Sequence, residues 1–261
     1  MTTSLVYTGD VDWHTIHNEV FLYEGNCWTT CNGGFCCSNN HPDFKFQLMP
    51  TEGTTILYME DEYEYLCQDG QVGETSLDWP EPQTMSLDYG GIRPLMIYHT
   101  PCHLLGLCEG KIDKPLLCKL YPFLPIFFAD GRLETLAPAS IFELTFEILA
   151  SQTPCTVMSK AVAYLERWRY HPDQLAPLRH PYIMLYLQAV KHFAEIYREK
   201  LLTNKKLAGK TGKDFWSAWE LQYLGGRLVD HGEWKTRVAE SCRELTDRYG
   251  EFLAPKESIP Q

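Results

Sequence analysis

The sequence predicts an α+β fold, mainly α overall, in which an irregular, β-containing first half precedes a helical second half. Up to about residue 138, short β-branched and aromatic runs alternate with connections rich in glycine and proline, which is typical of strands and loops. From Ser140 onward, apolar residues recur at the spacing of amphipathic helices. With 261 residues, 44% of them hydrophobic and 22% charged, the chain has the composition of a globular protein and can bury a core.

The change of composition at Pro138 indicates how the chain is organised. Residues 1–138 are expected to form a cysteine-cluster metal-binding module, and residues 139–261 a helical region. Because each amphipathic helix must bury its apolar face, we expect the helices to pack on the first module. The two regions are therefore either two domains or two layers of one integrated domain.

Local signals predict the elements of the first half. The first 50 residues contain several glycines and prolines and are expected to form loops. Thr54–Leu66 is predicted to be a strand followed by a short helix or a second strand, and Leu95–His99 a strand. Gln68–Pro94, rich in Gly, Pro, Asp and Glu, is predicted to be a long loop or insertion. Asp130-Gly131 lies between two apolar runs and predicts a hairpin turn.

Helical periodicity recurs in five segments of the second half. Ser159 is the expected N-cap of part of the second helix. The pair Trp216 and Trp219 is expected in the core or at a partner interface rather than at a cofactor site. The five segments are Ile141–Leu149, Val157–Trp168, Tyr182–Leu202, Phe215–Leu228 and Trp234–Phe252.

Seven of the ten cysteines fall into two short clusters. Residues 1–10 lack the basic and apolar regions of a secretory signal, so we expect a cytoplasmic protein. Thiols stay reduced in the cytosol, where clustered cysteines bind metals or do redox chemistry more often than they form disulfides. The candidate metal ligands are Cys27, Cys31, Cys36 and Cys37 in the first cluster and Cys102, Cys108 and Cys118 in the second.

Thiolates a few residues apart on a turn can reach one metal centre, with metal–sulfur bonds of about 2.3 Å. Gly33-Gly34 lets backbone amides approach the sulfurs, and Lys111, Lys114 and Lys119 offset thiolate charge near the second cluster. Thiolate ligation suits iron and zinc alike, and we favour a [4Fe–4S]-type iron–sulfur cluster, with zinc as the alternative. Four ligands complete either centre, so seven thiols indicate a second centre, a redox pair or a group that meets substrate.

The second cysteine cluster reads CHLL from Cys102, then Cys108, then KPLLCKLYPF from Lys114. Together with Cys27–Cys37, it resembles the CxxCxxCC cysteine-cluster family, the YkgJ-type zinc- or iron-chelating proteins. That family has a second cysteine group of the form C-x-(F/L)-L, C, (R/K)-P-x-x-C-x-x-(Y/F)-P. The resemblance covers about residues 20–128. The first cluster departs from the family spacing, which leaves open whether Cys36 or Cys37 is the ligand.

The resemblance implies metal binding more than any reaction, since most members of that family have no established activity. A distantly similar branch, the flagellin lysine methylases, is associated with an iron–sulfur centre and methyl transfer to lysine. No Gly-rich loop of the kind that binds S-adenosylmethionine follows a predicted strand here. A lysine methylase-like enzyme is therefore the weakest alternative.

Several other residues have simpler expected roles. Cys67 is expected in the core, and Cys155 and Cys242 are expected to be ordinary packing or surface residues. The acidic run Glu60–Glu64 is expected to be a solvated face rather than the source of a general base. Tyr121-Pro122 is expected to be a rigid turn that orients Cys118. Structural roles are favoured over metal ligation for the histidines His14, His17, His41, His99 and His103.

We therefore expect a metalloenzyme of unknown reaction class whose centre acts on an unidentified protein or small-molecule substrate. The alternatives are a metal-stabilised interaction module without activity and a protein for metal chelation or delivery. The net charge of −11 disfavours nucleic acid as a partner. The longest apolar stretches are too short to span a membrane.

Overall fold

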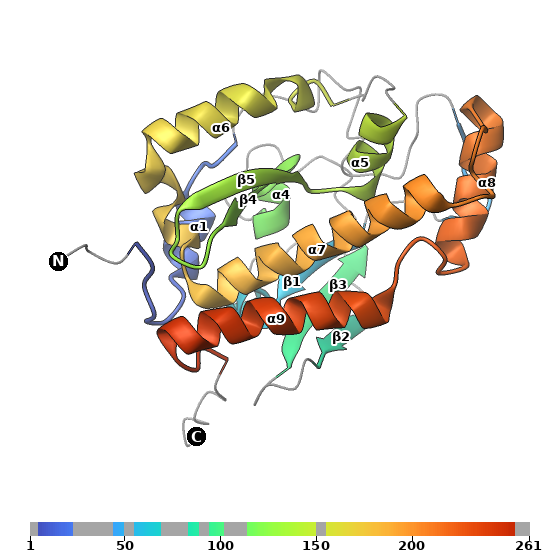
Figure 1. Cartoon of the computed structure of the whole chain (residues 1–261). Helices are drawn as coiled ribbons and strands as arrows, with labels where there is room; N and C mark the ends of the chain where they lie inside the picture. Colours follow the sequence, from blue (N-terminus) through green and yellow to red (C-terminus); the bar gives the residue numbers. More distant parts are fainter. Residues whose placement is uncertain are drawn as a thin grey trace.

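The computed structural model describes residues 5–22, 44–49, 55–68, 83–88, 94–101, 114–149 and 155–253. Its small antiparallel sheets and many helices confirm the predicted α+β, mainly α class (Figure 1). The helices are α1 (Trp13–Asn18), α3 (Glu60–Gln68), α4 (Leu116–Leu120), α5 (Ile141–Ile148), α6 (Ala161–Tyr170), α7 (Pro181–Thr203), α8 (Gly212–Leu224) and α9 (His231–Tyr249). Two 3₁₀ turns, η1 (Met158–Lys160) and η2 (Pro172–Leu178), flank α6.

A three-stranded antiparallel sheet has the order β1 (Thr55–Met59), β3 (Leu95–Pro101), β2 (Gln83–Leu87). The predicted strand at Leu95–His99 is confirmed as β3, and the strand-then-helix prediction for residues 54–66 is confirmed as β1 and α3. Strand β2 lies inside Gln68–Pro94, where the sequence predicts a long loop or insertion and no strand. Among the side chains of β2, only that of Leu87 is buried, so the strand depends on its pairing with β3 rather than on its own pattern.

The predicted hairpin is present as β4 (Phe123–Phe127) and β5 (Leu133–Pro138). Gly131 in its turn has φ of +84°, a left-handed conformation that favours glycine. A Cβ atom there would also lie 2.7 Å from Val6 Cγ2, so the N-terminal segment leaves no room for a side chain. The predicted hairpin turn at Asp130-Gly131 is therefore confirmed, and both the backbone conformation and the packing against Val6 favour glycine at position 131.

The second-half helices agree with the predicted segments, but one predicted cap is wrong. Ser140 caps α5, with its hydroxyl accepting a hydrogen bond from the Phe142 amide at 3.1 Å. Ser159 lies inside η1, and its hydroxyl donates to the Thr156 carbonyl instead of accepting from an amide. Helix α6 therefore begins at Ala161 with Lys160 at its N-cap position, one residue later than a Ser159 cap would start it, and the 3₁₀ turn η1 precedes it.

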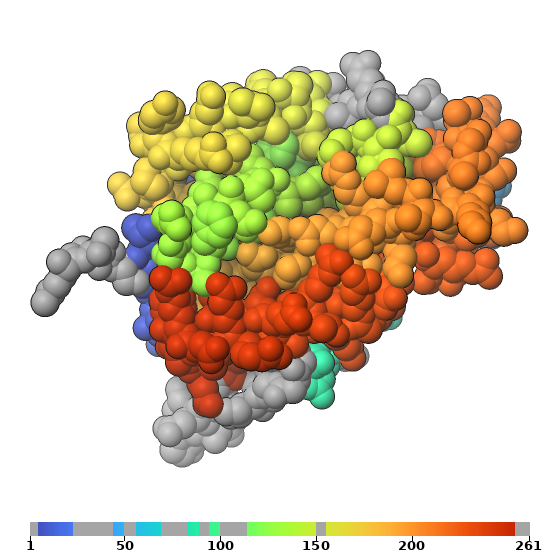
Figure 2. All heavy atoms as spheres, in the orientation of Figure 1, coloured from blue at the N-terminus to red at the C-terminus, as the bar shows by residue number. Residues whose placement is uncertain are grey.

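Helix α7 is the central element, and hydrophobic residues pack along its whole length. Figure 1 shows it running between the β4–β5 hairpin and α9, and Figure 2 shows α6, the hairpin, α7 and α9 as adjacent bands across one face. Its first part belongs to a central core that also contains both sheets and α9. Its last part, with Tyr197 and Leu201, belongs to a second core around α8, which we call the α8 core.

The α8 core confirms the structural role predicted for the tryptophan pair. Trp216 is 5% exposed and Trp219 is fully buried. The Trp219 indole Nε1 donates to the Tyr197 hydroxyl at 2.6 Å, which satisfies the polar end of a ring that is otherwise surrounded by apolar groups. Phe46, from the first half of the chain, packs in the same core.

Glu220 of α8 holds this first-half segment in place. The carboxylate is 3% exposed and accepts hydrogen bonds from the backbone amides of Gln47 at 3.1 Å, Leu48 at 2.7 Å and Met49 at 2.8 Å. The segment 44–49 follows the first cysteine cluster in the sequence, so Glu220 links that part of the chain to the C-terminal helices. Both cores thus draw residues from each side of residue 138, while the domain boundary itself stays a prediction.

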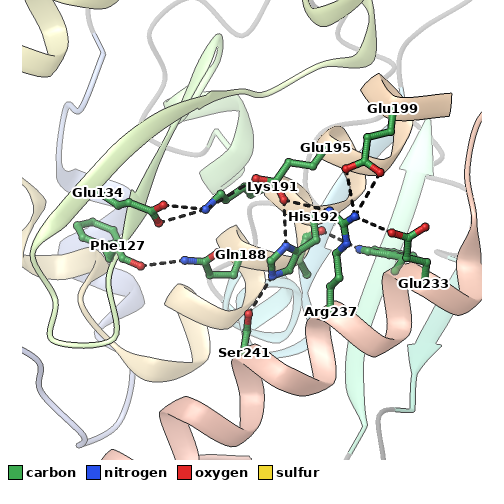
Figure 3. A network of polar contacts seen from close by, with 12 residues as sticks. Phe127, Glu134, Gln188, Lys191, His192, Glu195, Glu199, Glu233, Arg237 and Ser241 are labelled. Atoms are coloured by element: carbon green, nitrogen blue, oxygen red, sulfur yellow. Dashed lines mark hydrogen bonds and ion pairs between the residues drawn. The ribbon is translucent and has the colours of Figure 1, made fainter. Parts of the chain in front are cut away.

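A polar network joins α7 to α9 and to the hairpin at the surface (Figure 3). Arg237 of α9 contacts Glu199 at 3.1 Å and Glu233 at 2.6 Å, and Lys191 contacts Glu134 at 2.9 Å. His192 connects the helices through Ser241 Oγ at 2.9 Å. These groups pair with one another, as expected of a salt-bridge network that aligns two helices, and each exposed pair adds less than about 1 kcal/mol.

Candidate metal centre

Of the seven predicted metal ligands, Cys118 alone lies among the described residues; the other six, Cys27, Cys31, Cys36, Cys37, Cys102 and Cys108, lie outside them. Cys118 is exposed on α4. Within the described ranges, no group of three or more His, Cys, Asp or Glu side chains is arranged to hold a metal ion. The cysteine site therefore remains a prediction, and Cys118 on α4 is the candidate ligand whose surroundings the structure describes.

Helix α4 is a single turn whose orientation follows from its two end residues. Leu116 and Leu120, four residues apart on one face, are both fully buried. Cys118 falls between them on the opposite face and is therefore exposed. The helix packs against β1 and β4, so the thiol is presented from a short, well-anchored turn.

Buried carboxylates hold both ends of this turn. At its start, the Leu116 amide donates to Glu62 Oε1 at 2.6 Å. Directly after its end, the Tyr121 hydroxyl donates to Glu143 Oε1 at 2.5 Å. Glu62 is fully buried and Glu143 is 1% exposed. The chain then continues through a cis Tyr121-Pro122 peptide into β4. That Tyr121-Pro122 orients Cys118 stays a prediction. The hydrogen bond from Tyr121 to Glu143 is a contact through which it could do so.

Glu62 corrects the expectation that the whole acidic run is solvated. It occupies the third position of α3, where its Oε2 accepts a hydrogen bond from the Met59 amide at 3.4 Å, in the manner of the acidic residue of a capping box. Burial raises the pKa of the Glu62 carboxyl to about 7, and its hydrogen bonds and the charge of Lys119 lower it in part. Glu64, two residues further on, is exposed as predicted.

His17 of α1 lies beside Glu62. Its Nε2 is 3.6 Å from Glu62 Oε1, the residue is 2% exposed, and its ring stacks on Tyr65 with centroids 5.4 Å apart. The Lys119 ammonium donates to the backbone oxygen of His17. Helices α1, α3 and α4 therefore meet at one buried polar junction, which we call the Glu62 junction. His14, on the same helix as His17, is exposed and contacts Asn18.

The remaining predicted residues are placed as follows. Cys67 is exposed, so its assignment to the core is wrong: Leu66 and Glu62 form the buried face of α3, and the next position turns away from it. Cys242 is buried in α9 and Cys155 is half-buried, in agreement with packing roles. His99 lies on β3, while His41 and His103 are outside the described residues.

Tyr186 of α7 is a buried polar residue that sequence reasoning missed. It is fully buried, and its hydroxyl has no hydrogen-bond partner among the residues that the structure describes. Burial raises its pKa well above the usual value, and the negative charges of Glu62 and Cys118 act in the same direction. No local signal distinguishes this tyrosine from the apolar residues around it in YIMLYL.

Replacing Tyr186 by Phe is expected to raise the free energy of unfolding by about 1 kcal/mol, because it removes a buried hydroxyl that lacks a partner. Urea denaturation of the two proteins measures the change. Tyr197→Phe, on the same helix, is the matched control. Its hydroxyl contacts Thr145 and accepts from Trp219, so its loss is expected to cost about 2 kcal/mol. Equal effects of the two substitutions would contradict the prediction.

Comparisons with known proteins give no family, since no family model, no curated protein and no solved structure matches this chain. Among the described residues, no helix combines the length and apolar character needed to cross a bilayer. The resemblance to the cysteine-cluster family thus rests on the sequence motifs alone.

Proposed function

We propose that this chain is a metal-binding protein, most simply a metalloenzyme, whose two cysteine clusters hold an iron–sulfur cluster of the [4Fe–4S] type or zinc. The observation that carries the proposal is Cys118, an exposed thiol on a turn with buried carboxylates at both ends. An outward-facing thiol on a fixed backbone is what a metal ligand requires, because the sulfur must be both accessible and held in place. The grouping of the other six cysteines in the sequence supports it.

The chemistry of the donor set fits either metal. Thiolates bind zinc and iron–sulfur centres, and such a centre would supply a Lewis acid or an electron carrier to a protein or small-molecule substrate. Lys119 and Lys114 accompany Cys118 and place positive charge near a site whose ligands are negative. A cytoplasmic location is part of the same proposal, since the thiols must stay reduced to bind metal.

Anaerobic purification, followed by an absorption spectrum and elemental analysis, tests the proposal. An iron–sulfur protein shows a broad band at about 400 nm together with iron and acid-labile sulfide. A colourless protein with stoichiometric zinc would support metal binding and exclude the cluster. Protein that carries neither metal, and does not take up either when reconstituted under reducing conditions, would overturn the proposal.

Replacement of Cys118 by Ser is expected to speed metal release to an external chelator by at least about tenfold, because one thiolate ligand is lost. Cys67→Ser is the matched control, since both thiols are exposed in the described part of the chain and Cys67 lies outside the clusters. The control is expected to release metal at the parent rate. Equal release rates for the two variants would remove Cys118 from the ligand set.

A further inference from the structure

The Glu62 junction contains a carboxylate whose burial is costly. Glu62 has no exposed surface, and a Leu or Met of similar volume would fill the same space without the desolvation cost of an acid. Its raised pKa expresses this cost. What the carboxylate contributes is hydrogen-bond acceptors for backbone amides, and an apolar side chain at this position could not accept those hydrogen bonds.

The two oxygens of Glu62 bind different segments of the chain. Oε2 accepts from the Met59 amide, a local contact at the start of its own helix. Oε1 accepts from the Leu116 amide at 2.6 Å, across 54 positions of sequence. The second contact is the shorter one, and it is the one that reaches the cysteine-bearing turn.

The Leu116 amide needs this acceptor. As the first residue of α4, Leu116 has no carbonyl within its helix to accept from its amide. Pro115, which precedes it, caps the turn without a side-chain hydrogen bond. A buried amide without an acceptor costs about 1–3 kcal/mol, so the backbone at Leu116 is fixed where Glu62 is.

We propose that Glu62 is a positioning residue for the proposed metal site: it fixes Cys118 through the Leu116 amide. Cys118 is two residues from Leu116 within a single helical turn, so a displacement of that amide moves the thiol with it. The inference rests on the proposed function in assigning Cys118 as a ligand. The hydrogen bond that carries it is independent of any metal.

Three variants of the full-length protein test this role. Glu62→Ala removes both acceptors, Glu62→Gln keeps one acceptor oxygen for the Leu116 amide, and Glu64→Gln makes the same change at an exposed position of α3. We expect Glu62→Ala to speed metal release to a chelator by about tenfold, the effect typical of losing a group that orients a ligand. We expect Glu62→Gln to remain within about threefold of the parent, and Glu64→Gln to equal it.

Two further measurements separate positioning from a general loss of stability. Amide hydrogen exchange across residues 116–120 is expected to quicken in Glu62→Ala and to recover in Glu62→Gln. Leu245→Ala, which opens a cavity in the central core on α9, is expected to lower stability without changing metal release. If Leu245→Ala releases metal as fast as Glu62→Ala, the positioning role is overturned.

The two proposals fail in distinguishable ways. If the parent binds no metal, the proposed function fails, yet exchange across residues 116–120 and the alkylation rate of Cys118 still report on the role of Glu62. If the parent binds metal and Glu62→Ala matches it in release rate and exchange, the positioning role fails alone. Should Glu62→Ala not fold, Glu62→Gln with parent-like exchange supports the role, and Glu62→Gln with exchange as fast as an unstructured peptide overturns it.

Discussion

The free energy of unfolding is expected to fall by about 3 kcal/mol more in the parent protein than in Glu62→Gln as the pH rises from about 4.5 to about 7. Glu62 has its pKa raised from 4.5 to about 7 by burial, so between these values the native state keeps a proton that the unfolded state has released. Stability therefore decreases as pH rises through this window, and Glu62 adds no further pH dependence above it. Each pH unit of difference corresponds to about 1.4 kcal/mol.

Urea denaturation of both proteins at a series of pH values gives the difference, and other titrating groups cancel in the comparison. Because His17 Nε2 lies 3.6 Å from Glu62 Oε1, the parent and Glu62→Gln are also compared in a His17→Gln background. Infrared difference spectra provide a direct check, with a protonated carboxyl signal at pH 6 that is absent from Glu62→Gln. Parallel stability curves for the parent and Glu62→Gln would contradict the prediction.

Replacement of Glu220 by Ala is expected to lower the free energy of unfolding by about 3 kcal/mol, because three backbone amides lose a charged acceptor at once. Part of the loss is recovered where water can reach the amides of Gln47 and Leu48, which are exposed residues. Segment 44–49 is expected to become sensitive to protease before the rest of the chain unfolds, because these three hydrogen bonds hold it to α8.

The matched control is Glu240→Ala, at an exposed position of α9, which is expected to change stability by less than about 0.5 kcal/mol. Glu220→Gln keeps one acceptor oxygen and is expected to fall between the two. A Glu220→Ala protein as stable as Glu240→Ala would show that the three amides find equal partners in water.

Elements with strong local patterns could be predicted from the sequence. The long helices α7 and α9 follow from their apolar spacing, and the β4–β5 hairpin follows from Asp130-Gly131 between two apolar runs. Strand β2 could not, because its sequence QTMSL is weakly patterned and lies in a region rich in turn-forming residues. Its structure depends on β3, which no local window contains.

The surroundings of the candidate site could not be predicted either, because they also depend on contacts between residues far apart in the sequence. Glu62 belongs to an acidic run that is more simply explained by solvent exposure, and its burial is explained by the Leu116 amide, 54 positions away. The buried carboxylate of Glu220 likewise has its hydrogen-bond partners in backbone amides more than 170 positions away. The cysteine pattern is a different kind of signal, since residue type and spacing alone indicate metal chemistry, and six of those seven thiols lie outside the described residues.

The bond between Glu220 and segment 44–49 has a consequence for protein synthesis. The two partners are separated by about 170 residues, so at 5–20 residues per second the segment leaves the ribosome about 10–35 s before its carboxylate does. During that interval the first cysteine cluster has been translated while its neighbouring segment lacks its anchor. The thiols of the first cluster are therefore synthesised well before the segment that follows them can reach its final structure.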